Sequence, residues 1–207
     1  MPNVSNVKSK FFGAVDALDA DGISVAASIG SATTLTLGGT LTSGGSYTSG
    51  DNIGQLVTIL SAGDDSGITF TVVGTDAVGD AQTEVVTGAD TGTATSSGYF
   101  NTVASITTSG ASAGNVSAGV TGTGTGTIFA GRTRVRGLQG LSAATAGNLL
   151  FKNTSVTGTT LMTIPTSTST TDLIEPYIPD NAVLLDAGAY VSFAAGLAAG
   201  VTVFYDG

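Results

Sequence analysis

The side chains that most enzymes use for nucleophilic or redox chemistry are missing from this chain. It has no histidine and no cysteine, so a Ser-His-Asp triad, a Cys-His pair, a histidine-ligated zinc ion and thiol redox chemistry have no residues to form them. A pair of carboxylates can hydrolyse a glycoside, but the only glutamates are Glu84, in a predicted strand, and Glu175, next to a proline. Most aspartates stand beside glycine, which is typical of turns. We therefore expect no enzyme, no catalytic residue and no cofactor, and keep a carboxylate-pair glycosidase as a remote alternative.

Aspartate-rich turns are the remaining candidates for chemistry, as calcium sites. Residues 19–22 faintly resemble a calcium loop, but Ala17 occupies the preceding ligand position and no glutamate closes the loop. The aspartates at 64–65 and in the loop 76–80 could bind calcium with the help of turn carbonyls. A solvated acidic turn explains the same residues, and we expect no metal site.

The most specific polar feature is a run of alternating arginines. Arg132, Arg134 and Arg136 share one face of a predicted strand because successive side chains of a strand point to opposite faces. Two interpretations stay open. The strand is either a solvated edge whose charge prevents further strand pairing, or a docking stripe whose guanidinium groups bind carboxylates of another subunit.

Residues 1–25 differ in their hydrophobic pattern from the rest of the chain. Apolar side chains recur there at helical spacing, which permits a short helix, but an extended arm fits the segment equally well and is the interpretation that we favour. In the arm, Lys8, Lys10, Phe11 and Phe12 would contact a neighbouring surface. Together with the three arginines, these four residues form the hypothetical assembly interface.

From residue 26 onward the pattern is one of short strands and turns. The segments are rich in Val, Ile, Thr and aromatic residues, and Gly, Ser, Asp or Asn bound them. Within residues 68–88, Phe70 and Val72 alternate with threonines, and the loop 74–80 supplies turn-forming Gly and Asp, so a hairpin is predicted. No helical stretches alternate with the strands. The predicted fold class is all-β, with two small antiparallel β-sandwich or barrel-like domains and an N-terminal arm.

Glycine content sets the predicted domain boundary. The sequence VTGTGTGTI, residues 120–128, has glycine at every second position in its centre, and such a stretch has few side chains to bury. The predicted organisation is an arm (1–25), a first β domain (26–120), a Gly/Thr linker (121–127) and a second β domain (128–207).

Charge and hydropathy exclude several partners. The formal charge is −9, and residues 1–125 hold two basic against ten acidic groups, while residues 126–207 hold four against five. The first half would repel a phosphate backbone, so we expect no nucleic acid. No apolar stretch approaches the roughly 20 residues of a membrane span, and no signal peptide is recognised at the start. We expect no membrane partner and synthesis as a soluble cytoplasmic product.

Two segments resemble known proteins. Residues 55–120, and especially 61–107 (SAGDDSGITFTVVGTDAVGDAQTEVVTGADTGTATSSGYFNTVASIT), resemble a β module of tailed-bacteriophage virion proteins. Residues 180–207, ending in VTVFYDG, resemble the C-terminal end of small virion proteins. The resemblance implies a noncatalytic structural protein, most similar to capsid decoration (cement) proteins. It implies the major capsid protein as partner, a homo-oligomer with a trimer favoured, and a place on the capsid exterior after synthesis in the bacterial host. A tail or head fibre module that binds the host surface is the alternative.

Overall fold

The structure, a computed structural model, describes residues 6–207, and over that range it consists of strands and loops without a helix. The chain forms two compact units. Unit 1 contains the chain up to Val15, residues 51–53 and residues 125–207, whereas unit 2 contains residues 16–50 and 54–124. The predicted all-β class is thus confirmed. None of the described residues lies in a helix that could span a bilayer.

Unit 1 is built from two groups of antiparallel strands. In the first, β18 lies between β1 and β12, and β12 pairs on its other side with β15 and β16. In the second, β13 lies between β14 and β17, and β17 is followed in the sheet by the end of β11. The bounds are β1 (Val7–Gly13), β18 (Ala198–Asp206), β12 (Thr133–Ser142), β15 (Leu173–Ile174), β16 (Val183–Leu185), β14 (Thr160–Thr166), β13 (Gly147–Asn153), β17 (Ala189–Ala194) and β11 (Asn115–Phe129).

The core of unit 1 forms from the inward residues of these strands. Alternation is clear along β18, where Val201 and Val203 are fully buried and Thr202 between them is half-buried. Phe12 of β1 and Phe151 of β13 are also fully buried in this core. Burial of large side chains supplies most of the stabilisation of such a sandwich-like unit.

Unit 2 likewise has two groups of antiparallel strands around its own core. One contains β2, the start of β11, β6 and β9; the other has the order β4-β5-β10-β7-β8, with β3 also paired to β10. Residues buried between them include Val57, Phe70 and Ile106. The bounds are β2 (Asp19–Ser28), β6 (Gly54–Asp64), β9 (Asp90–Phe100), β3 (Thr33–Thr34), β4 (Thr42–Ser43), β5 (Ser46–Thr48), β10 (Thr102–Thr108), β7 (Thr69–Thr75) and β8 (Ala81–Thr87).

The hairpin predicted within residues 68–88 is confirmed. Strands β7 and β8 pair in antiparallel register from Thr69 opposite Thr87 to Thr75 opposite Ala81. Phe70 and Val72 are fully buried, as their alternation predicts. By contrast, the segment 33–41, which has the same strand-like composition, forms a strand only at its start, in β3.

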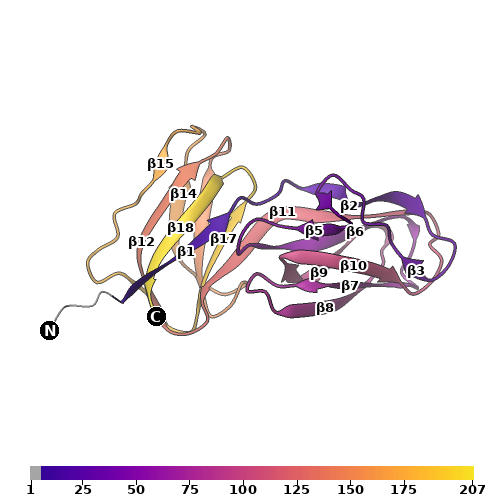
Figure 1. The fold of residues 1–207 in the computed structure, drawn as a ribbon, viewed down its shortest axis with the longest axis horizontal. Helices are drawn as coiled ribbons and strands as arrows, with labels where there is room; N and C mark the ends of the chain where they lie inside the picture. Colours follow the sequence, from indigo (N-terminus) through magenta and orange to yellow (C-terminus); the bar gives the residue numbers. More distant parts are fainter. Residues whose placement is uncertain (1–5) are drawn as a thin grey trace. The chain divides into compact units, whose positions relative to one another are not determined.

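The predicted arm is wrong for the described part of residues 1–25. Residues 7–13 form β1, which pairs with β18 from Val7 opposite Asp206 to Gly13 opposite Gly200 and runs alongside it in Figure 1. The short helix is excluded as well. Strand pairing prevails because Phe12 gains complete burial in the core of unit 1, and helical spacing in so short a segment is a weak preference. Residues 1–5 lie outside the described part.

The predicted linker is also wrong, because residues 121–127 lie inside β11. Thr125 is buried and its hydroxyl lies 3.2 Å from the hydroxyl of Ser192. Gly126 is needed for close packing, since a Cβ at that position would lie 2.5 Å from the ring of Phe12. Glycine and threonine alternate here because an extended, closely packed strand requires them, so composition alone misled the prediction.

Candidate functional site

The two units differ completely in charge. All six basic side chains belong to unit 1, where six acidic side chains balance them, so the formal charge of that unit is zero. Unit 2 has nine acidic and no basic side chains and therefore carries the whole formal charge of −9. The sequence-based division into halves indicated this asymmetry but understated it, because Lys8 and Lys10 precede unit 2 in the sequence while folding into unit 1. Unit 2 would therefore repel an acidic surface, whereas unit 1 carries no net charge that would do so.

The lysines of the predicted interface interact with their own unit. The ammonium of Lys8 donates a hydrogen bond to the carbonyl of Gly207 at 2.6 Å and lies 5.7 Å from the centre of the Phe129 ring. The ammonium of Lys10 donates to the carbonyl of Thr127 at 2.8 Å. These contacts tie β1 to neighbouring strands, so both lysines have a structural role.

The two phenylalanines of the predicted interface differ in exposure. Phe12 is fully buried, whereas the side chain of Phe11, on the opposite face of β1, is 46% exposed. Only Phe11 of this pair is therefore accessible to a partner.

The arginines alternate as predicted, with Thr133 and Val135 buried between them. They also have partners within unit 1. Arg136 binds the carboxylate of Asp206 and the carbonyl of Asp180, and Arg134 donates to the carbonyl of Asn181 at 2.6 Å.

Arg132 makes a looser ion pair with Asp186 at 3.8 Å, and both side chains are well exposed. The interpretation as an edge strand is wrong, because β12 has paired strands on both sides. Of the three arginines, Arg132 is the most available to another subunit.

The described surface of unit 1 carries an apolar face, which we define as Phe11, Leu141 and Leu173. Leu141 of β12 lies directly opposite Leu173 of β15 in the register, and their exposed fractions are 39% and 66%. Leu141 also pairs with Gly200 of β18. The ring of Phe11 lies over that glycine, where a Cβ would come within 2.6 Å of the ring. The three side chains therefore cross four neighbouring strands on the face opposite the core, and clustered exposed apolar groups of this kind mark interaction surfaces.

A buried polar cluster lies where the chain enters unit 2. The side chain of Gln55, fully buried, donates to the carbonyl of Asp16 and accepts from its N–H, at 3.1 and 3.0 Å. The hydroxyl of Tyr47 lies 2.9 Å from the Asp16 carboxylate and 3.0 Å from the Gln55 amide oxygen, which also accepts from Ser49. Burial raises the pKa of Asp16, although the bond from Tyr47 opposes the shift. Burial likewise raises the pKa of Tyr47. The cluster fixes the position of the backbone at Asp16.

Of the two glutamates singled out in the sequence, Glu84 binds backbone groups of unit 2. Glu84 accepts hydrogen bonds from the N–H groups of Ser97 and Gly98 at 2.6 and 2.9 Å. It lies in unit 2, whereas Glu175 lies in unit 1.

The aspartates of the acidic turns considered as candidate calcium sites bind backbone groups. Asp76 accepts from the N–H groups of Val78 and Asp80, and Asp64 from that of Ser66, which supports the interpretation as turns. Over residues 6–207, no group of three or more acidic side chains is arranged to hold a metal ion.

Comparisons of the chain with protein-family models, with curated proteins and with solved structures found no match. The functional argument therefore depends on the surfaces of the two units. Sequence reasoning selected Phe11 but missed Leu141 and Leu173. The outward position of Leu141 follows from the alternation of β12, since Leu138 is buried and Leu141 lies three residues on. The position of Leu173 beside it required the structure, because Leu173 belongs to β15.

Proposed function

We propose that this protein is a noncatalytic structural protein of a phage virion, most similar in role to a capsid decoration (cement) protein. In this proposal unit 1 binds the outer surface of the head, formed by the major capsid protein, and stabilises it. A homotrimer is the oligomer that we expect. The observation that carries the proposal is the division of labour between the units: unit 1 has no net charge and exposes the apolar face, and unit 2 carries all of the formal charge of −9.

The physical argument concerns which surface can be desolvated. Covering the apolar face of unit 1 removes large apolar side chains from water, which is favourable by about 25 cal/mol per Å². Covering unit 2 would bring nine carboxylates toward a partner without a single cation of its own to pair with them, and an unpaired charge is costly to bury. Attachment through unit 1 leaves the acidic unit in solvent, where like charges keep particles apart.

The first test is the copy number of the chain in purified virions, measured by quantitative mass spectrometry against the major capsid protein. A ratio near that of the capsid protein supports decoration of the lattice. A ratio of a few copies per particle would instead favour a tail or head fibre, and absence from the particles would overturn the virion proposal.

The second test uses point variants in a binding assay with particles that lack the protein. L173S removes the most exposed member of the apolar face and is expected to weaken binding about tenfold or more, as for a central interface residue. L161S is the matched control, because Leu161 lies on β14 of the same unit and is 47% exposed outside the apolar face. Equal binding by both variants would exclude the apolar face as the docking surface.

A further inference from the structure

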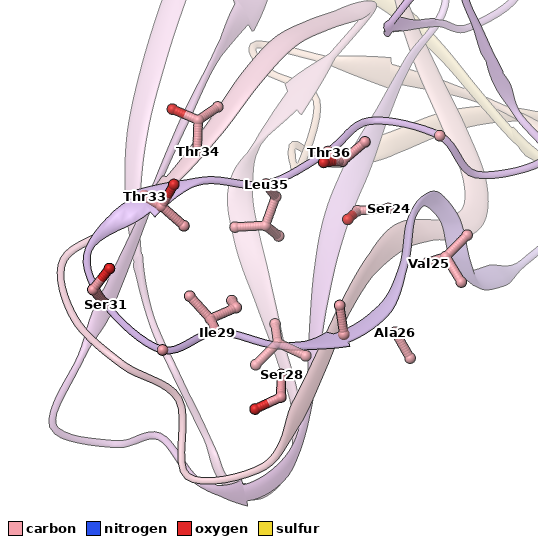
Figure 2. Close-up of a pocket in the computed structure, with 14 residues that line it drawn as sticks. Ser24, Val25, Ala26, Ser28, Ile29, Ser31, Thr33, Thr34, Leu35 and Thr36 are labelled. Atoms are coloured by element: carbon pink, nitrogen blue, oxygen red, sulfur yellow. The ribbon is translucent and has the colours of Figure 1, made fainter.

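Unit 2 contains an open groove between the edges of its two sheets. Its volume is about 550 Å³, within the range of ligand-binding pockets. One wall is the segment from Ser24 to Gly30, and the other is the segment 33–38. In Figure 2 the side chains of Ile29 and Leu35 point into the space between the walls, while Val25 and Ala26 point away from it.

The wall formed by β2 has a free backbone edge. On its far side β2 pairs with β11, including Ser28 opposite Asn115. On the groove side its hydrogen bonds stop early, since the N–H groups of Leu41 and Gly39 bind the carbonyls of Gly22 and Ile23. Beyond that point no hydrogen bond between described residues joins 24–28 to 33–38. The segment Ser24–Ser28 therefore faces the groove without a strand partner on that side, and a register shift relative to β11 lies within it, between Ser24 and Ala27.

The opposite wall is also an edge. Thr33 and Thr34 pair with β10, and the N–H of Leu35 binds the carbonyl of Ile106, all on the side away from the groove. Free N–H and C=O groups spaced along an extended strand are best satisfied by a second extended strand. The geometry of the groove therefore selects a polypeptide in β conformation over a compact small molecule.

Charge defines the sequence that such a strand should have. No residue that lines the groove is charged, so an ionised side chain inside it would be desolvated without a partner. Carboxylates flank both ends. At one end Thr40 donates to Asp19 at 2.7 Å. At the other, Ile29 donates to Ser112, whose neighbour Ala113 donates to Asp65; the Asp65 side chain is itself buried, and the adjacent Asp64 is the exposed carboxylate at this end.

Two of the flanking carboxylates are held in the ionised form. The hydroxyl of Thr40 lowers the pKa of Asp19, and hydrogen bonds from Ser66 lower the pKa of Asp64, the neighbour of Asp65. Both are therefore negatively charged in neutral solution. Basic residues at either end of a bound strand would find these charges within electrostatic range.

We propose that this groove binds an extended segment of another protein, with about five uncharged residues paired to the edge of β2 and with Lys or Arg at both ends. This inference is independent of the proposed function, since a protein outside a virion could use the groove in the same way. The probe is a labelled synthetic peptide with alternating threonine and valine at five positions between two pairs of lysines. Its control carries glutamates in place of the lysines.

Binding is measured by fluorescence anisotropy, and hydrogen exchange locates the bound peptide. The lysine peptide is expected to bind and to slow amide exchange at residues 24–28, while the glutamate peptide binds at least tenfold more weakly. Equal binding of the two peptides, absence of binding, or protection of another strand edge such as β8 in place of residues 24–28 would overturn the proposal. Protection of residues 24–28 without peptide, growing with protein concentration, would identify a second copy as the occupant and also overturn it.

A pair of variants separates the groove from the general charge of unit 2. T36R places a cation on the wall of the groove and is expected to reduce affinity for the lysine peptide about tenfold. T83R makes the same change at an exposed threonine of β8 outside the groove and shifts the formal charge equally. Unchanged exchange of core amides shows that each variant is folded. Equal affinities of the two variants would contradict the assignment to the groove.

Discussion

Two adjacent phenylalanines of β1 allow docking and folding to be tested separately. Phe12 is fully buried and Phe11 is 46% exposed. Replacing a buried phenylalanine by alanine costs the transfer free energy of the ring plus the free energy of the cavity that remains, together about 3–5 kcal/mol. Phe11 leaves no cavity and loses only about half of the transfer term, so F11A should cost about 1–2 kcal/mol. The expected difference is large compared with the total stability of a small unit.

The assay is guanidinium unfolding of both variants, followed by circular dichroism, with hydrogen exchange in β18 identifying the transition of unit 1. F12A is expected to lower the midpoint of that transition strongly, and F11A only slightly. In the particle-binding assay F11A should weaken attachment while the protein stays folded. If F12A costs no more free energy of unfolding than F11A, then β1 is not part of the core and the assignment of residues 7–13 to unit 1 fails.

Two further predictions concern the polar cluster of unit 2. The pKa of Asp16 is raised in the folded protein, so between the unfolded and the folded pKa the folded state binds more protons than the unfolded state. The contribution of Asp16 to the free energy of unfolding is therefore lost as pH rises from the unfolded pKa through the folded pKa. D16N should therefore gain stability relative to the parent across that pH range, as measured by urea unfolding at several pH values, and parallel profiles would contradict this. Q55A leaves the N–H and carbonyl of Asp16 without their partner and should lower the free energy of unfolding by about 2–4 kcal/mol. Q139A, at an exposed position, is the control and should lower it by less than about 0.5 kcal/mol. Similar midpoints of the two variants in chemical unfolding would refute the anchoring role of Gln55.

Much of the fold could be predicted because its strands carry their own signal. The alternation around Phe70 and Val72 and the Gly/Asp turn after them specify a hairpin locally. Strand β1 gave a misleading signal, since its partner β18 lies at the other end of the chain and nothing near residues 7–13 indicates it. The prediction that residues 121–127 form a linker was wrong for another reason. Packing demands on Gly126 come from Phe12 and Asn52, both remote in sequence, and composition cannot distinguish a packed glycine from a flexible one.

The candidate surface residues were likewise predictable only where strand alternation determines their position. Alternation correctly placed the three arginines on one face, but no local pattern indicated that Arg136 would bind Asp206 and the carbonyl of Asp180. Charge reversal of all three arginines would consequently break contacts inside unit 1, and a loss of assembly in that variant would not identify a docking stripe. R132E is the more informative change, because the partner of Arg132 lies at 3.8 Å and both side chains are exposed.

The same reasoning decides how the N-terminal segment should be tested. A deletion of residues 1–13 removes β1, and with it the pairing to β18 and the buried ring of Phe12. Loss of particle binding after that deletion would follow from damage to unit 1 whether or not the segment contacts a partner. Only a substitution on the outward side of β1 removes a contact while preserving the strand. F11A therefore distinguishes an interface from a structural element, because the alternation of a strand assigns these two roles to neighbouring residues.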